Sequence, residues 1–495
     1  MIEYDEIIQC KKMKKRNCKF VKTGSVLAYA LVMIGVVSII LISLLGYVTS
    51  QLKFSMNRVE KERAFQVAEA GIFYYKWYLA HETSGRTAQQ IADFWQNGNP
   101  LGADSAYEAS YEGTGHYSIT VQRPNNGSTT VLVTSVGWSD KNPDMKRTIR
   151  VRLRRPSWSE YLFLSNSFMN FGDQSEVFGK VFSNGGIRFD GIAHNTVSAL
   201  PARFDDTTYG GNRQEFGVHT TVNPADGAAP AYPWPDGTVP DRPDIFQGGR
   251  EFPASEVSFN GVTADLANMK TEAQAGRGKY FNNDGQGRKI ILKNDGTYDI
   301  CTVNSANNNT HAITNYLRNS GSGTCANCSG LCVSNYPIVD EGVIFVEDNA
   351  WVEGTVNGKN ITIVAANLSG GGNSADIYIG TSNNNLRYAA YDCNNMLGLI
   401  GQRDVRVLGS CPDDFIVDAA LLAQTGTVGI NDNGFSGKNS LTFNGAIASY
   451  LQPYFQHGNS GFAVRFYNFD NDLLYCPPPY FPTGTEYSID LWEEL

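Results

Sequence analysis

Two hydrophobic patterns in the first eighty residues predict one long helix. Residues 25–48 contain no charged side chain, and at about 1.5 Å per residue this run spans about 36 Å, enough to cross a hydrocarbon core of about 30 Å. The residues that follow, up to position 79, contain no proline, and apolar side chains such as Phe65 and Ile72 recur at helical spacing on one face. We expect one continuous helix over residues 25–80, apolar in its first half and amphipathic in its second.

Basic residues dominate the leader that precedes the apolar run. Residues 1–24 hold seven Lys or Arg and three Asp or Glu, a net charge of +4, whereas the whole chain carries −9 and the remainder therefore −13. Because positively charged flanks stay in the cytoplasm, we expect a cytoplasmic N-terminus and an exported bulk. The apolar run is longer than the about 7–15 residues of a cleaved secretory signal. A single-pass membrane protein with an uncleaved anchor is the alternative.

The segments on either side of the apolar run carry a family resemblance. The leader ends in Lys22-Thr23-Gly24, and residues 63–71 read RAFQVAEAG. Together they resemble the PilX-type N-terminal region of type IV pilus assembly proteins. The residues that match the family motif are Ala64, Phe65, Ala68, Glu69, Ala70 and Gly71. The resemblance implies a pilin-like fold, removal of the leader after Gly24 so that Ser25 becomes the N-terminus, and packing of the helix against other pilin-like subunits.

One position departs from the pattern of major pilins. They place Glu at the fifth residue of the mature chain, and the corresponding residue here is Tyr29. A carboxylate in lipid is costly and is thought to guide the register of the subunits. Its replacement by Tyr points to an accessory or initiating subunit, or to a protein that stays outside the filament.

Alternation of apolar and polar residues predicts a small antiparallel sheet in residues 81–160. We expect strands at 117–121, 130–134 and 147–153, with a hairpin turn at 125–127. Such a sheet would cover the apolar face of the helix, as in a pilin-like head. A basic row along the third strand, more typical of a solvated face than of a binding site, consists of Arg147, Arg150, Arg152, Arg154 and Arg155.

Short β-rich pieces separated by Gly, Asn and Asp occupy most of the chain from residue 161. They lie at 161–164, 176–182, 186–189, 343–346, 351–356, 361–365, 377–379, 399–400, 405–408, 415–417 and 441–447. Few gaps between them admit a crossover helix, and hairpin turns are rare, so we expect a parallel β-solenoid, with a β-sandwich as the alternative. Between the two groups we expect an inserted module with a loop (220–245), a helix (264–275) and a hairpin (289–303).

These patterns divide the chain into five parts. They are the leader (1–24), the long helix (25–80), the small sheet (81–160), the start of the solenoid with the inserted module (161–340), and the remaining solenoid with a C-terminal tail (341–495). The last part has a resemblance of its own, carried by residues 342–347, 352–355, 419–424 and 473–482. These pieces are similar to the C-terminal region of uncharacterised bacterial surface proteins with PilX-type anchors, which implies architecture and localisation but no activity.

Seven of the nine cysteines fall in the part expected outside the cell, and Cys10 and Cys18 fall in the leader. The seven disulfide candidates are Cys301, Cys325, Cys328, Cys332, Cys393, Cys411 and Cys476. We favour disulfides because exported proteins form them readily, with Cys393 and Cys411 placed to join neighbouring rungs. The rival interpretation is a zinc site at residues 325–332 with Cys301 or His311 as the fourth ligand, although a second CxxC is missing.

Candidate catalytic chemistry is weak in this sequence. No GxSxG, HExxH or GxxxxGK[ST] motif occurs, and we expect no catalytic residue, cofactor or metal. Acidic pairs at 205–206, 413–414 and 470/472 are of the kind that glycan cleavage uses, but Asp is also common at turns. The acidic bulk lacks the basic face that neutralises phosphate, which argues against a nucleic-acid partner.

One hypothesis unites these features. A non-catalytic, minor-pilin-like accessory or tip subunit of a type IV pilus-like system would display a large β-rich head on the cell surface. Residues 25–48 would contact membrane lipid, and the helix would contact other subunits. The 50 Gly, 25 Tyr and 26 Phe favour a turn-rich β-head over a helix bundle. The alternatives are a membrane-anchored adhesin that binds a surface glycan and a solenoid enzyme that acts on polysaccharide.

Overall fold

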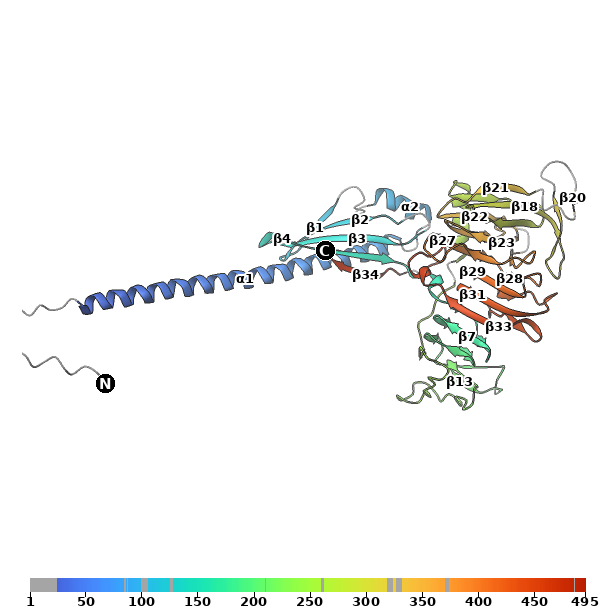
Figure 1. Cartoon of the computed structure of the whole chain (residues 1–495), viewed down its shortest axis with the longest axis horizontal. Coiled ribbons are helices and arrows are strands. Elements are labelled where there is room, and N and C mark those ends of the chain that lie inside the picture. Colours follow the sequence, from blue (N-terminus) through green and yellow to red (C-terminus); the bar gives the residue numbers. More distant parts are fainter. Residues whose placement is uncertain are drawn as a thin grey trace, which may run out of the picture.

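The computed structural model describes residues 25–83, 86, 88–98, 106–124, 128–209, 211–259, 262–317, 324–325, 332–369, 374–484 and 486–495. The molecule is elongated: a long helix carries a small sheet at one end, and a β-rich head lies beyond that sheet (Figure 1). Strands outnumber helices by far, so the fold is mainly β with a long N-terminal helix, as the sequence predicts. Gly24 and the expected turn at 125–127 lie outside the described residues.

The helix α1 (Ser25–Thr83) runs without a break through both halves of the expected helix. Its 59 residues correspond to a length of about 88 Å. The sequence allows this continuity because no proline interrupts it. Nearly every side chain before Glu60 is exposed, whereas beyond that residue one face is buried against the small sheet. A second, short helix, α2 (Ala88–Asn97), adds Phe94 to the same core.

The small sheet is antiparallel and contains two strands that the sequence did not predict, its first and its last. Its order is β1 (Tyr107–Tyr111), β2 (Gly115–Gln122), β3 (Val131–Ser139), β4 (Asn142–Arg154) and β34 (Ser488–Glu494). Strands β2, β3 and β4 match the three expected strands, and alternate residues of each are buried toward α1. The fifth strand comes from the end of the chain and pairs with β4.

The head is built from columns of parallel strands. The first column contains β16 (Gly278–Phe281), β22 (Gly342–Val346), β24 (Lys359–Ala365), β27 (Asn395–Gly401), β29 (Asp414–Ala423), β31 (Gly437–Ser449), β5 (Phe163–Ser165), β8 (Val181–Ser183), β11 (Val197–Ala199) and β15 (Arg250–Glu251). The second contains β17 (Gly287–Leu292), β23 (Ala350–Val356), β25 (Ile377–Ile379), β28 (Val405–Val407) and β30 (Val428–Ile430). Apolar side chains between the columns form one continuous core.

Shorter strands complete the head. Parallel strands that extend it are β33 (Ser460–Phe469), β7 (Ser175–Phe178), β10 (Ile192–Ala193), β26 (Leu386–Tyr388), β6 (Met169–Phe171), β9 (Ile187–Phe189) and β14 (Val218–His219). Antiparallel strands at its ends and edges are β12 (Arg203–Asp205), β13 (Gln214–Phe216), β18 (Thr297–Ala306), β19 (Ile313–Leu317), β20 (Thr324–Cys325), β21 (Val333–Pro337) and β32 (Gln456–His457). Two short 3-10 turns, η1 (Trp158–Glu160) and η3 (Asn471–Leu474), flank the junction with the small sheet.

The stack joins segments that lie far apart in the sequence. Strand β31, near the C-terminus, pairs in parallel with β5, and β33 pairs with β7. The strands of residues 163–251 therefore extend the stack beyond its C-terminal strands, toward β7 and β13 in Figure 1. The chain then returns to the opposite end, where β16 pairs with β22. On the return path, α3 (Val262–Gln274) packs Leu266 and Met269 on the outer face of the first column.

Parallel pairing bears on the two architectures that the sequence left open. An antiparallel sandwich would connect its strands by hairpins, whereas the two main columns pair in parallel throughout. The mainly β head with one large, predominantly parallel sheet is confirmed, and a coiled solenoid path is our interpretation of this pairing. The expected helix and hairpin are present as α3 and β17–β18. Because β17 also pairs with β23, the hairpin forms the end of the stack and is not separate from it.

A substitution at Gly137 tests how tightly α1 packs on the small sheet. A Cβ on Gly137 would lie 2.3 Å from both the Ala64 carbonyl oxygen and the Ala68 nitrogen. We expect Gly137→Val to lower the free energy of unfolding by about 2–4 kcal/mol, because helix and sheet must separate. Thermal unfolding followed by circular dichroism measures the effect. The matched control, Gly172→Ala, adds a Cβ where nothing lies within 4 Å, and equal destabilisation by both would contradict the packing argument.

Candidate functional site

The residues of the pilin-like motif lie where α1 approaches the sheet. Ala64 and Ala68 are fully buried and contact Gly137 of β3, and Gly71 faces Ser135 and Tyr117, whose atoms would lie 2.5 and 3.0 Å from an added Cβ. Small residues on both sides permit this close approach. The other motif residues, Phe65, Glu69 and Ala70, are half-buried at the edge of the contact. The motif thus has a packing role in this chain, and its functional meaning stays a prediction.

The first half of α1 is the largest apolar surface of the described chain. Side chains such as Leu31, Ile40 and Leu45 are 63%, 58% and 62% exposed. By length and composition, α1 can cross a membrane, and its most apolar window has a mean hydropathy of 2.7. Tyr29, at the position where major pilins carry Glu, is among the exposed residues. Soluble proteins do not leave a continuous surface of this kind uncovered, so lipid or other protein must contact it.

The buried half of α1 begins at a charged pair. Glu60 is 8% exposed and accepts a hydrogen bond from Arg63 Nη1 at 2.8 Å. From there the core of the small domain includes Ile72, Tyr75 and Leu79, which pack against β2, β3 and β4. Burial raises the pKa of the Tyr75 hydroxyl above its ordinary value. The transition from exposed to buried side chains therefore coincides with the first residues that the sheet covers.

The arginine row on β4 binds the chain's own C-terminal strand. Arg150 Nε and Nη2 donate to Glu493 at 2.9 and 2.6 Å. Asp490 accepts from Arg152 Nε at 2.8 Å and also from Arg154, and Arg147 pairs with Glu494. Burial alone would lower the pKa of the Arg154 guanidinium, but hydrogen bonds to Glu160 and Asp490 outweigh it and raise that pKa. We call these β4–β34 ion pairs the clasp. The expected solvated face is therefore largely neutralised within the chain.

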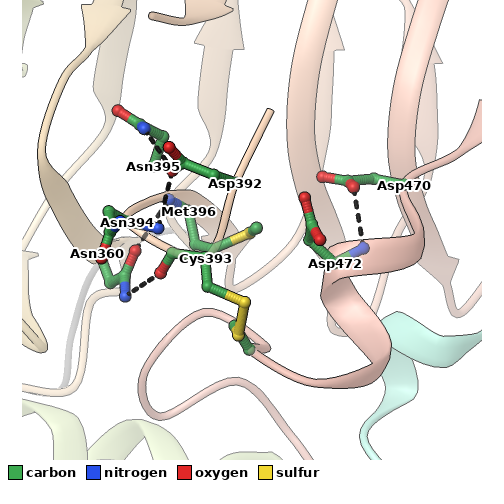
Figure 2. The surroundings of a disulfide bond; sticks show 9 residues. Asn360, Asp392, Cys393, Asn394, Asn395, Met396, Asp470 and Asp472 are labelled. Atoms are coloured by element: carbon green, nitrogen blue, oxygen red, sulfur yellow. Dashed lines mark hydrogen bonds between the residues drawn. A yellow bond between two sulfur atoms is a disulfide. The ribbon is translucent and has the colours of Figure 1, made fainter. Parts of the chain in front are cut away.

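The tail that leads to the clasp is fixed to the head. A disulfide joins Cys476 to Cys393, and the surroundings of this bond are drawn in Figure 2. Asn360 Nδ2 donates to the Cys393 carbonyl oxygen at 2.8 Å, and its Oδ1 accepts from the Met396 nitrogen at 3.0 Å, so the loop at Cys393 is held to β24. Farther along the tail, Tyr487 enters the core of the small domain. Head and small domain are therefore linked twice, before β5 and after Cys476.

Among the cysteines whose side chains the structure describes, four form disulfides and one is a free thiol. Cys301 is bonded to Cys332 and Cys393 to Cys476. The suggested bond between Cys393 and Cys411 is wrong, because Cys411 is a buried free thiol whose burial raises its pKa to about 12. The disulfide also removes Cys301 and Cys332 from the suggested zinc site, and no group of metal ligands occurs among the described residues. Cys10, Cys18 and Cys328, and the side chain of Cys325, lie outside the described residues.

The three acidic pairs do not converge. Asp206 contacts Arg188, Thr208 and His219 at the β12 end of the head. Asp413 pairs with Lys438 and Asp414 with Ser440, at the start of β29. Asp470 accepts from the Asp472 nitrogen and caps η3. The contacts of these pairs have no residue in common, so they form three local structures and not one groove.

A buried histidine also belongs to these local structures. His219 is fully buried and lies 3.1 Å from the Asp206 carboxylate through Nε2. Burial lowers the pKa of His219, although Glu215 and Asp206 oppose this effect.

The sequence analysis did not predict that the last strand, β34, pairs with β4. The acidic residues of β34 complement the arginines of β4, and this complementarity was the signal that could have indicated the pairing.

Comparison with known proteins adds little to this picture. No protein-family model matches the sequence, and no curated protein matches it either. Among solved structures, the chain is similar to the competence-associated pilin ComZ from Thermus thermophilus, with 14% sequence identity, a TM-score of 0.33, and coverage of 88% of this chain and 98% of that chain. A TM-score this low carries no argument, and the PilX-type resemblance stays a prediction.

A charge in the middle of the exposed half tests whether lipid covers it. We expect Ile40→Arg to release a large fraction of the protein from membranes in carbonate extraction, because an arginine at mid-bilayer costs about 2.5–3.5 kcal/mol or more. The control, Met56→Arg, places the same charge on an equally exposed part of α1 (65% against 58%) beyond the apolar run. Equal release of the two variants would show that residues 25–48 do not span the bilayer.

Removal of one clasp carboxylate tests its contribution to stability. Asp490→Ala leaves Arg152 without its acidic partner and removes one of the two acidic partners of Arg154, and the pairs are only 15–23% exposed. We expect the free energy of unfolding to fall by about 1–2 kcal/mol in urea titrations. The control, Glu82→Ala, breaks a more exposed pair between Glu82 and Arg86, four residues apart, and is expected to change the free energy of unfolding by less than about 0.5 kcal/mol. A smaller effect for Asp490→Ala than for this control would contradict the clasp.

Proposed function

We propose that this protein is a non-catalytic, minor-pilin-like accessory subunit of a type IV pilus-like system. The observation that carries the proposal is the division of α1. Its first half is apolar and exposed around the whole circumference, and its second half is fixed to a folded domain. A helix of this kind can exchange lipid for the apolar helices of other subunits without a change in its own fold, because lipid tails and apolar helices can both cover the same apolar side chains.

The size and position of the head support an accessory or tip role. The stack of parallel strands lies at the far end of the molecule from the exposed half of α1 and extends to both sides of the helix axis (Figure 1). Many copies of so wide a head would collide around a shaft whose subunits are packed by their stems. The absence of a carboxylate at Tyr29 agrees with a subunit that is not repeated along the shaft. We infer that few copies are present and that the head is displayed.

The proposal includes removal of the leader and a defined orientation. Gly24 and Ser25 form the expected cleavage position, and the basic leader keeps the N-terminus in the cytoplasm. After cleavage, the helix would begin at Ser25, the first residue of α1. The disulfides in the head agree with an oxidising, extracytoplasmic location.

Filament fractions test the proposal directly. We expect the full-length gene product to be recovered in sheared surface filaments at low copy number, and intact-mass spectrometry to give a chain that begins at Ser25. Gly24→Val should keep the leader and hold the protein in the membrane, whereas Gly35→Ala, at an exposed glycine within α1, should still be processed. A chain that retains residues 1–24 and stays in the membrane would support the anchor alternative instead.

A further inference from the structure

A row of outward-facing side chains crosses the second column of the head. Aligned positions on neighbouring parallel strands are Trp351, Tyr378, Arg406, Gly429 and Tyr454. The residues on either side of Tyr378, Arg406 and Gly429 are buried in the core between the columns, so these three positions point away from it, whereas Tyr454 also packs against the edge of that core. Aromatic and basic side chains thus stand at the spacing of β-strands along one side of the stack.

A glycine interrupts this row where the backbone of Tyr454 comes close. Gly429 has no side chain, and a Cβ there would lie 2.3 Å from the Tyr454 carbonyl oxygen. Arg406 reaches across the gap and donates from Nη1 to the Tyr454 hydroxyl at 2.9 Å. A cavity that both of these side chains line has a volume of about 230 Å³. Because pockets for drug-sized molecules begin at about 300 Å³, a ligand that fits this cavity is small.

Charged groups line the cavity in fixed pairs. Asp376 is 2% exposed, and its carboxylate accepts from Arg403 Nε at 2.9 Å and from the Tyr378 hydroxyl at 3.1 Å. Asp404 accepts from the Thr427 nitrogen at 2.7 Å and lies 3.3 Å from Arg406 Nη2. Buried partners therefore hold these donors and acceptors in place before a ligand arrives, which lowers the entropic cost of binding.

The open side of the cavity combines an aromatic face with a carboxylate. The half-buried Tyr454 donates its hydroxyl to Asp432 Oδ2 at 3.0 Å. His311, from the turn between β18 and β19, stacks on Tyr378 with ring centroids 4.6 Å apart. Burial lowers the pKa of His311, so this imidazole is neutral at pH 7. Three carboxylates and two guanidinium groups then give the lining a net charge of −1.

These features select the chemistry of a ligand. An apolar molecule would displace water from the charged lining and offer no hydrogen bonds in its place, which is costly. An anion would meet a net negative lining in which both arginines are already paired. A neutral polyol offers hydroxyls that donate to the carboxylates and accept from the guanidinium groups, and the apolar face of a sugar ring can pack on Tyr454. We propose that this cavity binds one neutral sugar unit.

The site is independent of the proposed pilus role, because a head that binds sugar works equally on a filament or on a membrane anchor. Isothermal titration on the full chain, in lipid nanodiscs prepared without glycosidic detergent, would use methyl hexosides of glucose, galactose and mannose, with galacturonate as the acidic comparison. We expect at least one neutral hexoside to bind and galacturonate to bind about tenfold more weakly or not at all. If an oligosaccharide binds more tightly than the methyl hexoside of the same sugar, the ligand is a glycan. If the two bind equally, the ligand is a free sugar. Both results support the site.

Two variants make the assignment specific. Asp432→Asn removes the negative charge of Asp432, and Tyr454→Phe removes the hydroxyl that donates to it; we expect each to weaken binding about tenfold. The control, Asp413→Asn, neutralises an exposed Asp that pairs with Lys438 outside the cavity and should bind as the unchanged protein does. Unaltered circular dichroism and thermal unfolding would establish that the variants fold. Absence of neutral-sugar binding, equal affinity of Asp432→Asn and the unchanged chain, or tighter binding of galacturonate would overturn the proposal.

Discussion

The helix α1 is longer than the sheet that covers it, and this mismatch governs the molecule. The sheet begins to bury α1 at Glu60, so the apolar residues before that point have no partner within the described chain. Exposed apolar surface is unfavourable in water at about 25 cal/mol per Å². Contact of this surface with lipid or with other apolar helices would remove that cost. Because the helix has no break, whatever holds its first half also fixes the orientation of the head.

The head depends on contacts between segments distant in sequence. The strands of residues 163–251 pair with β31 and β33. This part of the stack therefore cannot form until residues 437–469 have been synthesised. The same holds for the small sheet, whose edge strand β34 is the end of the chain. Such non-local pairing slows folding, since loops of several hundred residues must close first. The clasp and the Cys393–Cys476 disulfide both join residues near the end of the chain to earlier segments.

Polar residues inside the head serve the stack itself. Asn444 donates from Nδ2 to Asp418 Oδ1 at 2.7 Å, and its Oδ1 accepts from Asn468 Nδ2 at 2.9 Å, a ladder across three neighbouring strands. Glu347 is buried and binds Lys270 of α3, which ties the returning segment to the first column. The partners of these groups are side chains of neighbouring strands and of α3, and burial without such partners would destabilise the fold.

The sequence by itself determined the elements whose signal is local. The uncharged run, the absence of proline and the helical spacing of Phe65 and Ile72 were sufficient for α1, and alternation was sufficient for β2, β3 and β4. Tertiary structure decided the rest. The arginines of β4 pair with acids more than 300 residues away, and Cys393 is bonded to Cys476 and not to Cys411. Residues between His311 and Tyr454, from several strands and turns, come together around one cavity. Periodicity reports which face of an element is buried, but which distant strand covers that face depends on the path of the whole chain.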